Sequence, residues 1–137
     1  MSLFVDTSAW YAAADRGDRN NSRAKRVLGS VQPLVTTDHV LIETWILLRH
    51  RLGRDSAGRF WDGLRTGVCH IESTTSADLE AARAISESYS DNDFSIVDCT
   101  SFAVMQRLGV HQVATFDSDF AVFRFGPGRR RAFTIVR

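Results

Sequence analysis

The sequence predicts a single α/β domain built around a mostly parallel β-sheet. Short apolar runs alternate with segments of helical periodicity along the 137 residues, and strands that alternate with helices are typical of parallel sheets. This length suits one well-buried core, and no internal repeat, low-complexity tract or proline-rich linker divides the chain. We therefore expect one domain over residues 1–137.

Local patterns predict the individual elements. Leu3–Val5 is an apolar run that predicts the first strand, and Asp6 directly after it is typical of a helix start. A second helix N-cap is expected at Asp38, and Gly109 is expected to end the last long helix. Further strands are predicted at residues 34–36, 68–71, 112–115 and 132–136, and further helices at residues 22–31, 38–52, 55–64, 76–88 and 95–108.

The overall composition is that of an ordinary soluble protein. Hydrophobic residues make up 44% and charged residues 24% of the chain. The net charge of +1 does not by itself indicate a nucleic-acid-binding protein. All but one of the seventeen basic residues are arginine, Lys25 being the exception. This bias either favours phosphate binding or reflects a genome rich in G and C.

Targeting and redox features predict a cytoplasmic protein. No basic segment precedes an apolar one near residue 1, so a signal peptide is not predicted. The most apolar stretch, residues 40–48, contains Glu43 and is too short to span a bilayer. Cys69 and Cys99 form no CxxC pair, and we expect them to be reduced residues of the core.

Two acidic positions follow predicted strands. Asp6 comes directly after the first strand, and Asp117 comes just after the strand at residues 112–115. Ligands of open parallel sheets bind beyond the carboxyl ends of the strands, so both side chains are predicted at that edge. Simpler interpretations are that Asp6 caps a helix and that Asp117 and Asp119 form a turn around Ser118.

Two further acids belong to predicted helices. Glu43 has apolar neighbours on its own face of the helix at 38–52. A carboxylate buried there needs an arginine, a proton or a cation as its partner. Asp98 matches a capping box with Ser95, although its apolar neighbours also indicate a half-buried helix end.

The chemistry of these acids indicates a metal site. Carboxylates that converge on one cleft repel one another, and cations or protons relieve that repulsion. Oxygen ligands without paired histidines or cysteines favour Mg²⁺ or Mn²⁺ over zinc. One or two such ions suit phosphodiester hydrolysis, because they activate water and neutralise the leaving oxygen. The candidate catalytic and metal-binding residues are Asp6, Glu43, Asp98 and Asp117, with Asp119 as a further metal ligand.

Four segments then occur in a characteristic order: Phe4–Ala9, Glu43–Thr44, Asp93–Asp98 and Ala114–Phe120. They resemble the motifs of PIN domains and, more narrowly, those of the VapC toxins of bacterial toxin–antitoxin pairs. The resemblance spans residues 3 to about 123. It implies a three-layer α/β/α sandwich around a mostly parallel sheet of four to five strands. It also implies an endoribonuclease in which Mg²⁺ or Mn²⁺ activates the water that hydrolyses RNA.

The resemblance extends to residues and partners. It assigns the metal ligands to the same four acids, with Asp119 close by, and makes Thr7 or Ser8 an auxiliary hydroxyl beside the first acid. Members of this family commonly form homodimers, and a VapB-type antitoxin neutralises them by inserting a tail into the cleft. The expected partners are therefore RNA, a cognate antitoxin and a second copy of the chain.

Arginines are the remaining candidates for RNA contact. Arg49 and Arg51 follow Glu43 on the same predicted helix and either reach phosphate or pair with surface acids. A run of three arginines follows a Gly-Pro-Gly turn in a segment, Gly126–Arg131, that matches no family motif. It either binds phosphate or is a solvated cluster that protects an edge strand. The run consists of Arg129, Arg130 and Arg131.

Two alternatives to a toxin nuclease remain open. A PIN-like RNA-processing nuclease outside a toxin–antitoxin pair would use the same catalytic residues. A non-catalytic binding module would use the acids as helix caps, and it predicts no loss of activity on Asp6→Asn. A phosphatase or a receiver domain is disfavoured, because Ser8 stands where a phosphatase would have its second acid and a receiver would need a lysine near its last strand.

Overall fold

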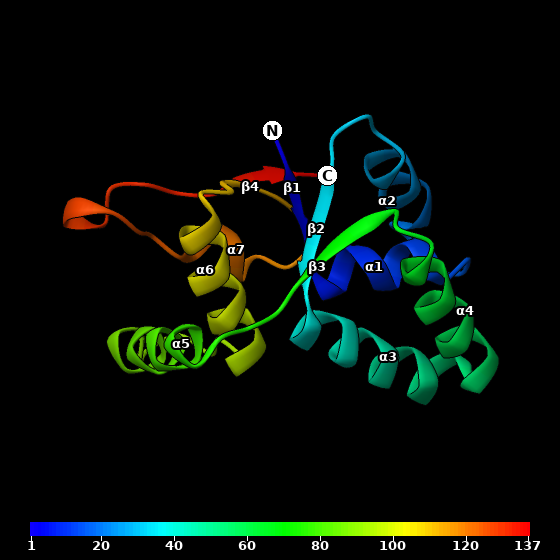
Figure 1. Ribbon diagram of the computed structural model, residues 1–137, viewed down its shortest axis with the longest axis horizontal. Coiled ribbons are helices and arrows are strands. Elements are labelled where there is room, and N and C mark those ends of the chain that lie inside the picture. Colours follow the sequence, from blue (N-terminus) through cyan, green and yellow to red (C-terminus); the bar gives the residue numbers. More distant parts are fainter.

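A five-stranded parallel sheet lies at the centre of the computed structural model, which describes all of residues 1–137 (Figure 1). The spatial order is β3-β2-β1-β4-β5, and every neighbouring pair is parallel. This confirms the expected sheet, and all five predicted strands are present. Their bounds are β1 (Leu3–Val5), β2 (Leu34–Thr37), β3 (Cys69–Glu72), β4 (Gln112–Ala114) and β5 (Thr134–Val136).

Helices cover both faces of the sheet and make a three-layer sandwich. Figure 1 shows α1–α4 on one side of the sheet and α5–α7 on the other. The change of side follows from the strand order: right-handed crossovers move outward from β1 to β3 in one direction and from β4 to β5 in the other. The helices are α1 (Thr7–Ala14), α2 (Asn21–Leu28), α3 (Asp38–Leu52), α4 (Arg54–Arg65), α5 (Ser76–Ser88), α6 (Ile96–Leu108) and α7 (Asp119–Val122), with a 3₁₀ turn at Pro127–Arg129.

Two details of the helices differ from the sequence prediction. The N-cap of α3 is Thr37 rather than Asp38, because the Thr37 Oγ1 accepts the backbone N–H of Val40 at 3.1 Å. Asp38 instead accepts from the N–H and the hydroxyl of Thr74, at 3.0 and 2.7 Å, and so ties α3 to the segment before α5. The helix predicted to reach residue 31 ends at Leu28.

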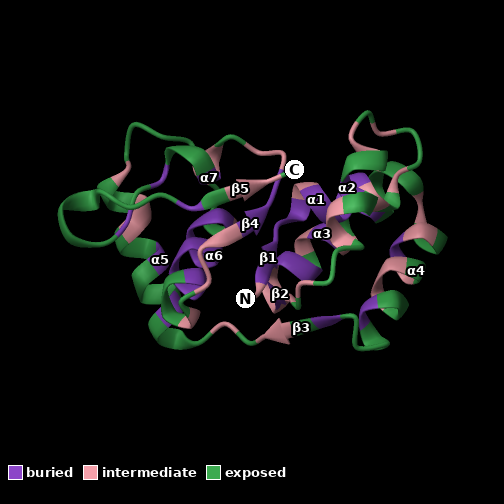
Figure 2. Cartoon of the chain, turned by 90° about the horizontal axis from the view of Figure 1, so that it is seen from above, coloured by how far each residue is buried: buried purple, intermediate pink, exposed green.

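The core lies on both sides of the central strands. All three residues of β1 are fully buried, and Figure 2 shows the buried residues gathered on β1, β4 and the inward sides of α1 and α6. Phenylalanines dominate one half of this core, where Phe102 stacks on Phe123 with ring centroids 4.3 Å apart. Cys69 and Cys99 are buried and unpaired, as predicted. None of the helices combines the length and the apolar composition needed to cross a bilayer.

The strand order determines where a ligand can bind. The chain steps from β1 outward to β3, then returns to the other side of β1 with β4, so the direction of winding reverses between β1 and β4. At such a reversal the connections leave the two strand ends in opposite directions, and a crevice opens at their carboxyl ends. The residues that follow β1 and β4 therefore form the edge of the sheet at which a site is expected.

Candidate active site

Asp6 lies at this crevice, immediately after β1. Its side chain is almost fully buried, and it does not make the hydrogen bond of an N-cap to α1. The Oδ2 atom instead accepts hydrogen bonds from the Ser8 hydroxyl at 3.0 Å and from the Thr115 hydroxyl at 2.9 Å. Burial, with a smaller contribution from the nearby Asp117, raises the pKa of Asp6 to about 6. Helix capping therefore does not explain this residue.

Thr115 is a residue of the site that sequence reasoning missed. It is fully buried at the end of β4, donates to Asp6 and accepts the backbone N–H of Asp117 at 3.0 Å. Its Oγ1 also lies 3.1 Å from the Ser8 Oγ. The available signal was a polar residue between an apolar strand and an aspartate, because a buried hydroxyl needs a partner.

Asp98 reaches the same place from the opposite layer. It forms the predicted capping box at the start of α6: its carboxylate accepts the Ser95 N–H at 3.2 Å, and its own N–H donates to the Ser95 hydroxyl at 3.0 Å. Burial raises the pKa of Asp98 to about 7, together with repulsion from Asp6, Asp117 and Asp119. Asp98 therefore caps α6 and also lies among other acids.

Asp117 and Asp119 complete a tight group with Asp98. One carboxylate oxygen from each of the three residues lies within 4.8 Å of the others. The turn after β4 fixes the orientation of the Asp117 side chain, because the backbone N–H of Asp119 donates to the Asp117 Oδ1 at 2.9 Å. Burial and the neighbouring Asp117 raise the pKa of Asp119. We call these three residues and Asp6 the acidic group.

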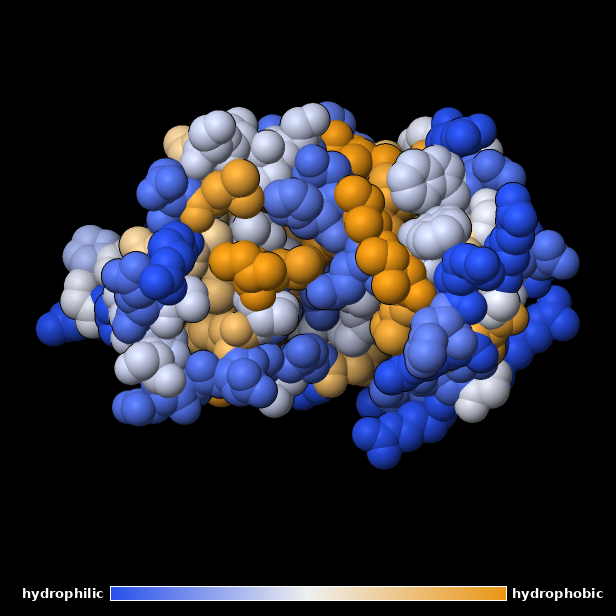
Figure 3. All heavy atoms as spheres, turned by 90° about the horizontal axis from the view of Figure 1, so that it is seen from below, coloured by the Kyte–Doolittle hydropathy of each residue, from blue (hydrophilic) through white to orange (hydrophobic).

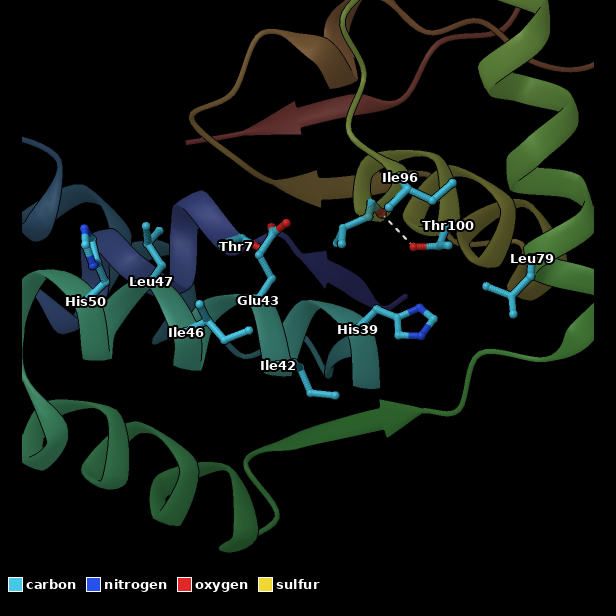
Figure 4. A pocket seen from close by; sticks show the side chains of 11 residues that line it. Thr7, His39, Ile42, Glu43, Ile46, Leu47, His50, Leu79, Ile96 and Thr100 are labelled. Atoms are coloured by element: carbon cyan, nitrogen blue, oxygen red, sulfur yellow. Dashed lines mark hydrogen bonds between the residues drawn. The ribbon is translucent and has the colours of Figure 1, made fainter.

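Glu43 lies outside the acidic group and contacts Thr7, the residue that follows Asp6. Its Oε1 accepts a hydrogen bond from the Thr7 hydroxyl at 2.6 Å, and Figure 4 shows the two side chains meeting between α3 and α1. Glu43 is half-buried rather than buried. No other element fully covers this face of α3, since Ile46, one turn further along it, is 57% exposed. No arginine pairs with Glu43.

The donor set of the acidic group fits a hard divalent cation. The ion pairs of the chain all involve other acids, so no arginine, lysine or histidine neutralises these four carboxylates. Carboxylate oxygens at this spacing, with no histidine or cysteine among them, suit Mg²⁺ or Mn²⁺. A cation bound here would relieve the repulsion that raises the pKa of Asp98.

The arginines predicted for RNA binding lie elsewhere. Arg51 lies over the Tyr11 ring at 5.2 Å, and Arg129 lies over the Tyr89 ring at 4.8 Å. Arg131 lies over Phe125 and contacts the Nδ1 of His111, just before the amino end of β4 and so at the end of the strand opposite to the acidic group. Arg49 and Arg130 are exposed. None of the five arginines lines the apolar groove between α3 and α6 that adjoins the site.

An apolar groove runs beside the acidic group. It has a volume of about 740 Å³ and lies between α3 on one side and α5 and α6 on the other, with Glu43 and Thr7 in its lining (Figure 4). Figure 3 shows apolar side chains gathered on both sides of a hollow on this face. Its apolar lining consists of Ile42, Ile46, Leu47, Leu79, Ile96 and Val97.

Comparison with known proteins identifies the family. A model of the PIN domain matches residues 3–126. The chain belongs to the PIN domain family. It is 38% identical to the 23S rRNA-specific endonuclease VapC20 of Mycobacterium tuberculosis over 124 residues, which is 90% of this chain and 95% of that protein. It is 26% identical to Ribonuclease VapC26 of the same organism over 137 residues, 98% of this chain and 99% of that protein.

Solved structures support the same assignment within the PIN domain family. The crystal structure of M. tuberculosis VapC20, described as a Sarcin-Ricin loop cleaving toxin, superposes with a TM-score of 0.84 at 37% identity, covering 88% of this chain and 93% of the other. A toxin–antitoxin complex from Klebsiella pneumoniae shares the fold, with a TM-score of 0.64 at 14% identity over 85% of this chain and 88% of the other. The chain is a VapC-type endoribonuclease, as its motifs predicted.

Proposed function

We propose that this VapC-type PIN domain hydrolyses RNA with Mg²⁺ or Mn²⁺ held by Asp98, Asp117 and Asp119, and with Asp6 as a fourth carboxylate of the site. The supporting observation is a group of two buried and two half-buried acids without a counter-charge. Burial, together with repulsion from neighbouring acids, raises the pKa values of Asp6 and Asp98, and no positive charge of the chain offsets this effect. A divalent cation is the partner that this arrangement lacks.

The residues around the acidic group hold its carboxylates in place. The Ser8 and Thr115 hydroxyls both donate to the Oδ2 of Asp6, and no side chain donates to its Oδ1, which would face the cation. The capping box similarly fixes Asp98 at the start of α6. When bound, the cation lowers the pKa of water and offsets the charge that develops on the phosphate oxygens. We assign Glu43, which accepts a hydrogen bond from Thr7 next to Asp6, to orienting the attacking water.

The substrate that we propose is ribosomal RNA. VapC20, which shares 38% identity over nearly its whole length, is specific for 23S rRNA, and its crystal structure is described as that of a Sarcin-Ricin loop cleaving toxin. We also propose that the protein acts in the cytoplasm as the toxin of a VapBC-type pair and that a cognate VapB-type antitoxin inhibits it. The toxin–antitoxin complex with the same fold is consistent with such a pair.

We further propose that the chain forms a homodimer through the apolar groove. Ile46 and Ile96 are each 57% exposed and Ile42 is 48% exposed, although all three are strongly apolar. These protruding side chains line the hollow that separates them. A two-fold axis could therefore place the protruding side chains of one copy in the groove of the other. This is the self-complementary arrangement of an isologous dimer.

Cleavage of ribosomal RNA within intact ribosomes tests the proposed activity. The protein is incubated with intact ribosomes in Mg²⁺ or Mn²⁺ and in excess chelator, and the cut ends are mapped by sequencing. We expect one dominant cut in 23S rRNA, no cut in chelator, and a cut lost in Asp98→Asn. Equal cleavage by wild type and Asp98→Asn would exclude the metal-site assignment, and cutting at many unrelated sites would exclude the proposed substrate.

The homodimer has its own test. Ile46→Glu places a charge in the groove, while Leu52→Glu places one on the same helix outside it, at a side chain that is also exposed. We expect sedimentation velocity to show dimers for the wild type and Leu52→Glu and monomers for Ile46→Glu. Monomeric wild-type protein at the highest soluble concentration would contradict the proposal.

A further inference from the structure

A second hollow lies beside Phe116, the residue directly before Asp117. It has a volume of about 420 Å³ and is lined by five residues. Three of them are arginines from two distant parts of the chain, and one is the phenylalanine that directly precedes Asp117. We call it the basic pocket. Its lining consists of Arg19, Asn20, Arg23, Phe116 and Arg137.

The charges of the basic pocket are not neutralised within the chain. Arg19, Arg23 and Arg137 are exposed, and none of the ion pairs or side-chain hydrogen bonds of the chain involves them. The acids closest to them in sequence are engaged locally. Asp15 accepts from the Gly17 N–H and the Tyr11 hydroxyl, and Asp18 accepts from the Asn20 N–H. The three guanidinium groups therefore remain available to an anion.

The amino end of α2 adds to this positive character. The residue at the N-cap, Asn20, makes no side-chain capping bond, and the first turn of α2 contains no acid. The N–H of Asn21 donates to the Asp18 carbonyl, and the N–H groups of Ser22 and Arg23 remain to carry the partial positive charge of the helix start. Asn20 and Arg23 bring this helix end into the lining of the pocket. The pocket thus combines three side-chain cations with a helix dipole of the same sign.

Covalent and hydrogen-bonded connections join the basic pocket to the acidic group. Phe116 and Asp117 are consecutive, with Cα atoms about 3.8 Å apart. The N–H of Phe116 donates to the Ser8 hydroxyl at 2.9 Å, and the same hydroxyl donates to Asp6 at 3.0 Å. An anion in the pocket would therefore lie within the length of a nucleotide or two from the carboxylates.

We propose that the basic pocket binds the RNA strand next to the cleaved bond, with Arg19, Arg23 and Arg137 on a backbone phosphate and Phe116 against a base. This rests on the proposed function. Four clustered carboxylates repel a polyanion, so a cation-lined contact beside them holds the strand where they would otherwise push it away. A half-buried aromatic ring beside cations suits stacking on a base.

Binding of single-stranded RNA tests this pocket separately from cleavage. A fluorescein-labelled oligonucleotide is titrated with protein in Mg²⁺ on the Asp98→Asn background, at several salt concentrations. The triple variant Arg19→Gln/Arg23→Gln/Arg137→Gln is compared with Arg59→Gln/Arg65→Gln/Arg83→Gln, which removes the same charge from exposed positions outside the pocket. Each lost phosphate contact lowers the slope of log K against log salt by about 0.7. Because the three arginines share one phosphate, we expect a slope smaller by about 0.7 in the pocket variant and a nearly unchanged slope in the control.

Phe116→Leu tests the aromatic contact at nearly constant volume. Loss of one stacked base weakens binding by about fivefold or more, whereas the melting temperature of this variant should stay close to that of the wild type. A polyglutamate peptide is the competing probe, because an acidic protein segment would also be attracted to three arginines. Binding of polyglutamate as tight as that of RNA, with RNA binding insensitive to Phe116→Leu, would overturn the proposal in favour of an acidic peptide.

The outcomes separate this inference from the proposed function. Equal affinities and equal salt slopes in the two triple variants would overturn the basic pocket even if the enzyme cleaves ribosomal RNA as expected. Absence of any metal-dependent cleavage, with the salt slope still reduced in the pocket variant, would overturn the nuclease assignment and leave the RNA-binding pocket standing.

Discussion

Helices α5 and α6 begin with the same local device, yet the two starts have opposite chemistry. Thr75 and Asp78 form a capping box at α5, and Ser95 and Asp98 form one at α6. Both aspartates are buried. Asp78 accepts two hydrogen bonds of 2.9 Å from Arg107, which holds the pKa of that carboxyl below its ordinary value. Asp98 has burial and other acids around it, and its pKa rises to about 7.

The difference lies in the tertiary neighbours and not in the motif. A capping box stabilises a helix start in either case, because it satisfies backbone N–H groups that the helix leaves unpaired. At Asp78 the charge is also neutralised, and Glu72 joins the same arginine at 2.9 Å, so the cluster ties β3, α5 and α6 together. At Asp98 the charge is left without a counter-charge, which indicates a binding role rather than a purely structural one.

The largest expected effect comes from neutralising the aspartate of each capping box, Asp98 or Asp78, in separate variants. Asp98→Asn keeps an oxygen for the Ser95 N–H but removes a carboxylate of the proposed metal site. Because a bound cation supplies several kcal/mol at the transition state, cleavage should fall about a thousandfold or more. Asp78→Asn should lower the free energy of unfolding by about 2 kcal/mol and leave cleavage per folded molecule unchanged. Urea titration and single-turnover cleavage measure both; a comparable loss of cleavage in the two variants would remove the distinction.

The two regions should also respond to pH in opposite ways. Asp6 and Asp98 have pKa values of about 6 and about 7 in the folded chain and an ordinary value of 3.8. The folded state therefore holds more protons than the unfolded state between about pH 4 and 7. In chelator, the free energy of unfolding should fall by several kcal/mol as pH rises through that window, because each pKa unit corresponds to about 1.4 kcal/mol.

Asp78 contributes with the other sign. Its pKa is lowered, so its stabilisation is present above pH 3.8 and is lost as pH falls below that value. Saturating Mg²⁺ should reverse the trend between pH 4 and 7, because the cation binds the ionised carboxylates. Thermal unfolding across pH, with and without Mg²⁺, checks both effects. If the free energy of unfolding in chelator did not change between pH 4 and 7, the acids of the acidic group would not share one environment.

Thr115→Val removes the buried hydroxyl that donates to Asp6 and tests whether it positions that carboxylate. Loss of this donor should raise the pKa of Asp6 further and let its carboxylate rotate. The Mg²⁺ concentration for half-maximal cleavage should rise by about 10- to 100-fold, as is common when a partner of a metal ligand is removed. Thr44→Val is the matched control, since Thr44 is equally buried but donates to the Val40 carbonyl within α3. A similar Mg²⁺ requirement in the two variants would leave Thr115 without a positioning role.

The smallest expected effect is at Arg107. Its side chain is 36% exposed, so solvent screens the ion pairs with Asp78 and Glu72. Arg107→Met should lower the free energy of unfolding by about 1 kcal/mol and leave cleavage per folded molecule unchanged. The control is Arg83→Gln, which breaks a fully surface-exposed pair with Glu87 on α5 and should change stability less. A loss of activity in folded Arg107→Met would mean that the two clusters are coupled along α6.

Local patterns predicted most of the fold because each element has its own signal. The strands are short apolar runs, and Gly109 ends α6 with a positive φ of 67°, as a helix-terminating glycine should. Cap identity was harder, since Thr37 and Asp38 are adjacent and both can cap. Their side chains were separated by tertiary contact, because Thr74 lies where it can bind Asp38.

The acids could be predicted from the sequence, whereas most of their surroundings could not. Asp6 and Asp117 follow strands, which is a local signal with a known spatial consequence. Burial of Glu43 was overestimated, because the periodicity of a helix does not reveal whether its apolar face is covered. The run Arg129–Arg131 was conspicuous in sequence, but two of its members lie over aromatic rings. The basic pocket joins residues more than a hundred positions apart, so only the folded chain reveals it.

The pairing of the first strand with the fourth has a consequence for synthesis of this enzyme. The hydrogen bond between Asp6 and Thr115 spans 109 positions, and Asp117 lies beyond it. A nascent chain on the ribosome holds Asp6 long before it holds the strand that brings Asp117 near it, and Asp98 is made only shortly before that strand. The proposed metal site is therefore incomplete until nearly the whole polypeptide has been made, and products of premature termination before β4 should be harmless to the RNA of the ribosome that made them.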